Sequence, residues 1–266
     1  MKKYTFTMLL LLGLPWAAAR AQQAPSPPFR IGPLRLEEIS FSKAAGQCQN
    51  GPCMTASINY LKVVSAENAQ AAAKLTAALA DWVLRMDHGK VAKTPQEMLE
   101  WWVNREWKIR QEVSEPADSP PWYDTSTLKI EYQSARVLSL SCLGVGYYGG
   151  AHGHEGIAYA NFRPATGKPI RLTDIFKEGY AAPLNAIGER RFRELEGLSP
   201  QESLKEANFH FPNDQFQMNE NFSIGADGLT FYFDADEIAW HAAGPINLFL
   251  PYADIQKLLR PDAGIP

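Results

Sequence analysis

The order in which strand-type and helix-type segments follow one another is the feature that most limits the fold of this chain. Strand-type and helix-type segments come in clusters instead of alternating one by one; the strand-type ones are 35–43, 54–64, 126–134, 136–148 and 155–163, and the helix-type ones are 65–86 and 94–113. Strict alternation would favour a parallel sheet. Clustering predicts an α+β fold, a mainly antiparallel sheet packed with helices in two closely associated halves.

Apolar residues within these segments recur at the expected spacings. Leu128, Ile130 and Tyr132 alternate with polar residues, as on one face of a strand. Along 65–86 the apolar residues fall at helical spacing, at Leu75, Leu79, Trp82 and Met86. A helix therefore follows the first two strands.

The second helix carries a start signal. Thr94 can cap it, Pro95 suits its first position, and Glu97 follows the cap by three residues. Its expected buried face comprises Met98, Trp101, Trp102, Val103 and Ile109. An aromatic stripe of this kind is more often part of a core than a cofactor site.

The last third of the chain predicts a helix, a hairpin and a closing strand. The helix covers about 180–196, the hairpin turns around Asp227 and Gly228, and the closing strand 246–252 precedes a short helix.

The N-terminus has the layout of a secretory signal peptide. Two lysines precede an apolar run that is too short to span a bilayer, and a small-residue cleavage site ends at residue 21. Residues 22–32 are proline-rich and are predicted to form a flexible leader. We expect an exported protein, periplasmic or extracellular, with an N-terminal half at 33–118 and a C-terminal half at 119–262.

The three cysteines have two expected roles. Cys48 and Cys53 bracket an Asn-Gly-Pro turn, so in an oxidising compartment a disulfide is expected to close the turn. A zinc site would need a matching second pair, which the sequence lacks. Cys142 lies in an apolar run and is predicted to be a buried free thiol.

Charge excludes one class of partner. Without the signal peptide, the chain has 23 basic and 29 acidic residues. Nucleic-acid binding needs a concentrated positive surface, so we predict no nucleic-acid partner. No later segment is long and apolar enough for a membrane span.

The segment 147–163, YYGGAHGHEGIAYANFR, concentrates residues that could form either a site or a turn. Gly149, Gly150 and Gly153 suit a bend between two strands, and His152 could hydrogen-bond the bend. His152 and His154 are two apart, and on a strand both rings would share a face and could bind a metal. Candidate third ligands are His88, His210, His241 and Asp234, but no pattern links any of them to the pair.

Other catalytic signatures are weak. The sequence has no G-x-S-x-G motif, and the glycine-rich run at 144–153 has no Lys-Ser/Thr ending for phosphate. Asp234 and Asp236 lie where a strand meets a turn, and solvation explains them. We therefore predict no catalytic residue and no cofactor.

The same segment also resembles a known family. GGAHG, followed by Gly167, Ile170, Leu172, Asp174, Ile175 and Phe176 in a G-x-x-I-x-L-x-D-[IL]-F stretch, is similar to the signature of the RsiV-like extracellular domain family. The ending, with its D-G-L-x-F strand, GP turn and final PY strand, resembles that family too. Its members include the anti-sigma factor RsiV, whose extracellular domain binds lysozyme, and the non-catalytic N-terminal region of the peptidoglycan deacetylase PdaC.

The resemblance implies an exported, non-catalytic binding module of the cell envelope, with a lysozyme-type protein or a peptidoglycan-related ligand as partner. Tyr is favoured at interfaces, so the tyrosines are expected anchors. The candidate binding residues are Tyr147, Tyr148, Gly149, Gly150, Ala151, His152, Gly153 and Tyr159. The alternatives are a metal-dependent hydrolase that uses His152 and His154, and an assembly factor for envelope proteins.

Overall fold

The computed structural model describes residues 29–31, 34–85, 92–113 and 119–266. The predicted signal peptide, most of the predicted leader and Met86 lie outside these ranges. The end of the leader is a short strand, β1 (Phe29–Ile31), which pairs antiparallel with β2 (Leu34–Gly46).

A long hairpin forms one side of the main sheet. β2 pairs antiparallel with β3 (Cys53–Ser65), from Arg35 opposite Ser65 to Gly46 opposite Cys53. The predicted Cys48–Cys53 disulfide closes the turn between them, and its Cα atoms are 4.9 Å apart. This prediction is confirmed, as is the buried free thiol of Cys142.

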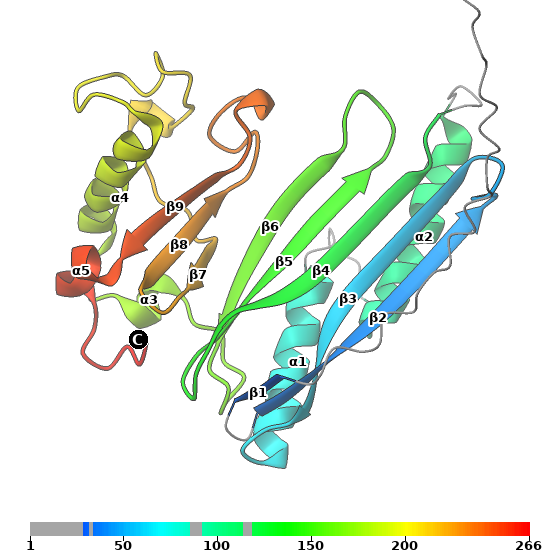
Figure 1. The fold of residues 1–266 in the computed structure, drawn as a ribbon, viewed down its shortest axis with the longest axis horizontal. Coiled ribbons are helices and arrows are strands. Elements are labelled where there is room, and N and C mark those ends of the chain that lie inside the picture. The colour runs from blue at the N-terminus through cyan, green and yellow to red at the C-terminus, as the bar shows by residue number, and fades with distance from the viewer. Residues whose placement is uncertain (1–28, 32–33, 86–91, 114–118) are drawn as a thin grey trace, which may run out of the picture.

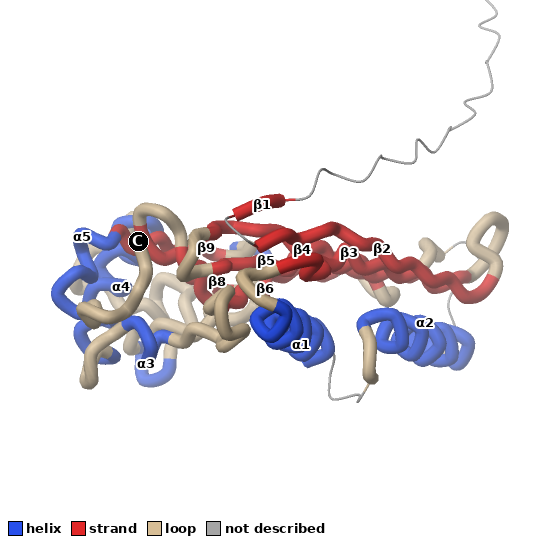
Figure 2. Tube along the Cα trace, turned by 90° about the horizontal axis from the view of Figure 1, so that it is seen from below, coloured by secondary structure: helices blue, strands red, loops and turns tan. Residues whose placement is uncertain are grey.

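Two helices connect β3 to the next strand. α1 (Ala69–Arg85) and α2 (Pro95–Glu112) lead to β4 (Trp122–Gln133), which pairs parallel with β3. Both helices cover the same face of the sheet (Figure 2). They bury Leu75, Leu79, Val83, Leu99 and Val103 against it.

The capping signals of α2 act as predicted. The hydroxyl of Thr94 accepts a hydrogen bond from the backbone N–H of Glu97 at 3.1 Å, and Pro95 is the first helical residue. The guanidinium of Arg110 donates to the backbone oxygen of Cys53 at 2.6 Å and to that of Pro120 at 3.0 Å. Arg110 thus attaches the end of α2 to the starts of β3 and β4.

An antiparallel meander completes the sheet. β4 pairs with β5 (Leu138–Tyr147), and β5 pairs with β6 (His154–Phe162). The sheet therefore has six strands in sequence order, and the β3–β4 pair is its parallel step. The predicted α+β fold with a mainly antiparallel sheet is confirmed.

A smaller sheet lies beside the β6 edge of the main one (Figure 1). β7 (Phe222–Ile224), β8 (Gly228–Phe233) and β9 (Ile246–Pro251) form it, with α3 (Leu172–Ile175), α4 (Ala181–Glu196) and α5 (Tyr252–Ile255) around it. The hairpin at Asp227 and Gly228 and the closing strand are confirmed.

Buried polar side chains join the two sheets. The side-chain amide of Asn161 in β6 donates to the backbone oxygen of Phe222 at 2.7 Å. The backbone N–H of Ile224 donates to the side-chain oxygens of Asn161 and Ser139, each at 3.1 Å. Asn161 and Ser139 are both buried, so these bonds fix how β7 sits on the main sheet.

Two buried hydrophobic clusters follow the sheets. One gathers residues between Leu34 and Phe162 under α1 and α2, and the other gathers Val137 and residues from Ile170 onward. The main sheet continues across the predicted boundary at 118–119, because β3 pairs with β4 there. The assignment of 33–118 and 119–262 to two halves stays a prediction. No helix in the described part of the chain is long and apolar enough to cross a membrane.

Candidate functional site

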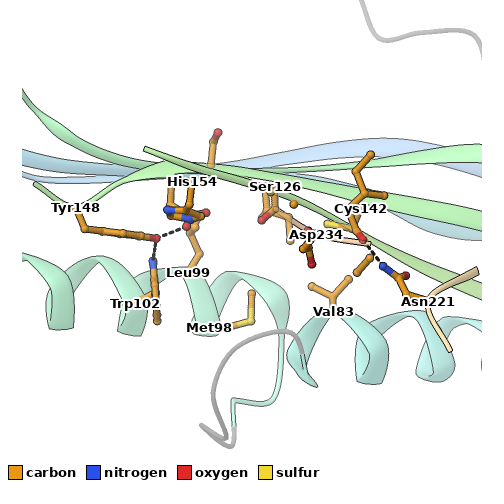
Figure 3. A pocket seen from close by; sticks show the side chains of 17 residues that line it. Val83, Met98, Leu99, Trp102, Ser126, Cys142, Tyr148, His154, Asn221 and Asp234 are labelled. Atoms are coloured by element: carbon orange, nitrogen blue, oxygen red, sulfur yellow. Dashed lines mark hydrogen bonds between the residues drawn. The ribbon is translucent and has the colours of Figure 1, made fainter. Parts of the chain in front are cut away.

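A cavity of about 600 Å³ lies between the main sheet and the two helices that cover it (Figure 3). The strands β3 to β6 form its floor, α1 and α2 its roof, and residues beside β7 and β8 close one end. The lining residues that matter chemically are Trp102, Asp124, Ser126, Cys142, Tyr148, His154, Asn221 and Asp234.

The register of the sheet explains why a cavity forms here. Ser126 in β4 lies opposite Gly144 in β5, and Gly144 lies opposite Gly156 in β6. Three neighbouring strands therefore place small residues in one row on the helix-facing side. A Cβ added at Gly144 would meet no atom closer than 3.9 Å. The floor is hollow at Gly144 because no side chain fills the space above that residue.

The next row of the sheet, two residues further along each strand, places Asp124 and His154 beside the aromatic ring of Tyr148. Asp124 lies opposite Gly146, which lies opposite His154. A Cβ on Gly146 would collide with the His154 ring, so glycine makes room for that ring. Tyr148 stacks on His154 with 5.1 Å between ring centroids and donates its hydroxyl hydrogen bond to Asp124.

Trp102 of α2 completes this group. Its indole N–H donates to the Tyr148 hydroxyl at 3.2 Å (Figure 3). Burial raises the pKa of Asp124, although the Tyr148 hydrogen bond and the nearby His154 oppose the rise. Burial, together with the Asp124 charge, also raises the pKa of the Tyr148 phenol. The phenol therefore stays protonated at neutral pH, and it remains a donor.

The opposite end of the cavity is built on the free edge of β6. The Asn221 side chain accepts from the backbone N–H of Tyr159 at 2.8 Å and donates to the backbone oxygen of Ile157 at 2.7 Å. One amide thus replaces the neighbouring strand that β6 lacks at this point. Its polar atoms are already engaged with the backbone.

Asp234, which follows β8, reaches the same edge. Burial raises the pKa of its carboxyl, the Glu237 charge adds to the rise, and a hydrogen bond from the Ile157 backbone opposes it. A hydrogen bond with the Tyr232 side chain also opposes the rise, and the Oδ1 atom of Asp234 is buried. Gly156 permits this approach, since a Cβ there would lie 2.7 Å from that oxygen.

Cys142 lies in the floor but is poorly suited to nucleophilic chemistry. Burial is the main cause that raises the pKa of its thiol to about 12. The thiolate is the reactive form of cysteine, and it is scarce at neutral pH with such a pKa.

The predicted GGAHG segment is mainly the loop between β5 and β6. Gly149 and Gly150 have φ values of 86° and 84°, a region that favours glycine. The Tyr147 hydroxyl donates to the backbone oxygen of Gly150 at 3.0 Å, inside the loop. Gly144, Gly146 and Gly149 have G-x-G-x-x-G spacing, but a strand follows them here, whereas a nucleotide-binding turn opens a helix.

The two histidines of the metal alternative have different neighbours. His152 Nδ1 lies 2.9 Å from the backbone oxygen of Gly153, and its ring stacks on His241 with 4.2 Å between centroids. His154 instead stacks on Tyr148. The expectation that both rings serve one metal on a common face is therefore wrong, because His152 lies in the loop before β6 begins. Within the described ranges, no group of three or more His, Cys, Asp or Glu residues could hold a metal ion.

Of the predicted binding residues, Tyr148 is the one that lines the cavity. Tyr159 lies at the junction of the two sheets, where its ring meets Tyr232 at 6.4 Å and 90°. The loop residues Gly149 to Gly153 are absent from the lining, although Gly153 borders a second, smaller hollow beside His241.

Sequence reasoning missed most of the cavity. Asp124, Asn221 and Asp234 are far apart in the chain, and Trp102 was assigned to the core. Asp234 was attributed to solvation, yet one of its oxygens is buried. The available signal was a set of small residues, Ser126, Gly144 and Gly156, but they align only once the strand register is known.

Comparisons with known proteins agree with this architecture. Residues 173–253, which include α4 and the smaller sheet, match the family described as "Protein of unknown function (DUF3298)". Two crystal structures of DUF3298 family proteins are similar to the chain. The one from Bacteroides fragilis has a TM-score of 0.69 and 20% identity over 85% of this chain and 94% of that one. The one from Pseudomonas aeruginosa PAO1 has a TM-score of 0.65 and 18% identity over 88% and 98%. No curated protein matches the chain.

At these identities the likeness shows a shared fold. The chain is thus an α+β protein with the architecture seen in DUF3298 family structures, and it carries a cavity between its main sheet and the helices α1 and α2.

Proposed function

We propose that this chain is an exported, non-catalytic binding module that takes a saccharide-type fragment of the cell wall into the cavity. The cavity between the sheet and the two helices carries the proposal. Its volume of about 600 Å³ is within the range of small-molecule sites. The ligand class follows from the lining and from the resemblance of the GGAHG segment to the RsiV-like family.

The lining has the mixture that a sugar requires. Trp102 and Tyr148 supply aromatic surface, while Asp124 and Asp234 supply carboxylate acceptors for hydroxyl groups. Met98 and Leu99 of the roof offer apolar surface for the carbon face of a sugar ring. Export is supported by the N-terminal pattern and by the Cys48–Cys53 disulfide.

Trp102 lines the cavity and provides a direct readout. We expect its fluorescence to change when a muramidase digest of peptidoglycan is titrated into the protein, and the change should be lost in Trp102→Phe. Isothermal titration of the same digest should show saturable binding. Saturable binding of lysozyme, with no response to the digest, would favour a protein partner and overturn the cavity proposal.

A further inference from the structure

A second hollow, of about 320 Å³, adjoins the cavity of the proposed site. The strand β6 lines both, since residues 156–158 border the cavity and residues 159–162 border the second hollow. The change from one to the other falls between two consecutive residues, whose Cα atoms are about 3.8 Å apart. The two hollows are therefore neighbours along the same strand.

Two further parts of the chain pass from one hollow to the other at the same place. In α1, Val83 lines the cavity and Trp82 lines the second hollow. At the start of β7, Asn221 lines the cavity, whereas Glu220 and Phe222 line the second hollow. Because three separate elements make this change within one or two residues, the hollows lie end to end along β6.

The Asn221 side chain holds β6 on both sides of the boundary. It accepts a hydrogen bond from the backbone N–H of Tyr159, which borders the second hollow, at 2.8 Å. It donates to the backbone oxygen of Ile157, which borders the cavity, at 2.7 Å. Both hollows thus share the β6 edge as a wall that one amide fixes.

The second hollow combines aromatic surface with a charged rim. Trp82 and Tyr159 are half-buried in its lining, and the Trp82 ring packs edge-on against Phe162 with 6.3 Å between centroids. The exposed charged residues of the lining are Asp81, Arg171 and Glu220. Carboxylates accept hydrogen bonds and a guanidinium donates them, so the rim offers both kinds of partner for sugar hydroxyl groups.

The two hollows together are elongated. The run 156–162 covers six steps along β6, or about 20 Å at the rise of a strand. A small fragment that fills the cavity leaves the second hollow unused. A longer chain of the same sugars makes contacts in both.

We infer that the second hollow extends the binding site and takes further sugar units of the same glycan chain. This inference rests on the proposed function and defines its ligand by length. The protein then selects longer glycan fragments over the disaccharide, because only the longer ones reach the lining of both hollows.

The test measures, by isothermal titration, the binding of a disaccharide and a tetrasaccharide fraction from a partial muramidase digest of peptidoglycan. Both fractions are freed of peptide stems with an amidase, so that they differ in length alone. We expect the wild-type protein to bind the tetrasaccharide at least ~10-fold more tightly, which corresponds to ~1.4 kcal/mol.

Ala78→Phe places a ring in the second hollow, because Ala78 lines it. This variant should reduce the tetrasaccharide advantage to less than ~2-fold and leave the affinity for the disaccharide unchanged. Ala77→Phe is the matched control and should keep the advantage, because Ala77 is exposed in the same helix and lines neither hollow. Arg171→Gln is a second variant, at an exposed position, and should lower the affinity for the tetrasaccharide alone.

The outcomes separate this inference from the proposed function. Equal affinity of the wild type for both fractions would overturn the inference and leave the proposed function standing. Binding of neither fraction would overturn both. A full tetrasaccharide advantage in both Ala78→Phe and Arg171→Gln, each with the thermal unfolding of the wild type, would show that the chain extends elsewhere and would overturn the inference.

Discussion

Adding a side chain at Gly144 tests whether the open space at this glycine is the place where a ligand binds. Gly144 lies in the middle of β5, its Cβ position points at the cavity, and the nearest atom to that position is the Gly156 backbone oxygen at 3.9 Å. Ordinary van der Waals space is therefore available. We predict that Gly144→Val folds normally and that its side chain occupies the cavity floor.

Two contributions determine how much Gly144→Val changes the free energy of unfolding. Replacing a strand glycine with a residue that fits its backbone stabilises a protein by about 0.4–1 kcal/mol, because the unfolded chain has fewer conformations to lose. Each methylene that becomes fully buried adds about 0.8 kcal/mol, and the open cavity reduces that value. We expect a gain of ~1 kcal/mol, which raises the melting temperature by about 2–4 °C for a chain of this size.

Binding should change in the opposite direction. The valine methyl groups occupy space that a ligand needs, so affinity for the saccharide fragments of the muramidase digest should fall at least ~10-fold, or ~1.4 kcal/mol. Gly144→Ala should stabilise the protein with a smaller loss of affinity. Leu143→Ala, on the opposite face of the same strand, should leave affinity unchanged. Lower stability of Gly144→Val, or unaltered affinity, would refute the reasoning.

Three further predictions concern Asn221, Asp124 and the Cys48–Cys53 disulfide. Asn221→Ala should lower the free energy of unfolding by about 2–4 kcal/mol, because the Tyr159 N–H and the Ile157 backbone oxygen lose their hydrogen bonds to this side chain. It should also accelerate hydrogen exchange of the Tyr159 amide, and unchanged exchange would contradict this. Burial raises the pKa of Asp124 above its unfolded value of about 3.9, so its contribution to stability is lost as the pH rises through the folded value. The stability of Asp124→Asn relative to wild type, measured by urea unfolding, should therefore increase as the pH rises above about 4, and a constant difference would disprove it. Reducing the Cys48–Cys53 disulfide, which spans five positions, should cost about 2 kcal/mol by loop entropy, and Cys48→Ser with Cys53→Ser should match the reduced protein in a thermal melt.

Local physical chemistry was sufficient for the elements of the fold. Alternation at Leu128 and Ile130 and the capping pattern at Thr94 act within a few residues, so a single sequence reveals them. The disulfide was predictable for the same reason, because a turn brings Cys48 and Cys53 together without help from the rest of the chain. The glycine-rich segment was likewise correctly placed between two strands.

The cavity depended on contacts between distant residues. Gly144 and Gly156 look like ordinary strand glycines until the β4–β5–β6 register aligns them with Ser126. His152 and His154 look like a pair until the loop ends between them.

The sequence by itself determined the α+β class, the positions of most helices and strands, the hairpin disulfide and the N-terminal export pattern, because each depends on neighbours along the chain. The tertiary structure alone decided which polar groups meet. Asp234, from the smaller sheet, reaches the edge of β6 beside the glycines of the main sheet, more than seventy residues before it in the chain. Strand register and packing between the sheets bring them together, and no local pattern in the sequence encodes that meeting.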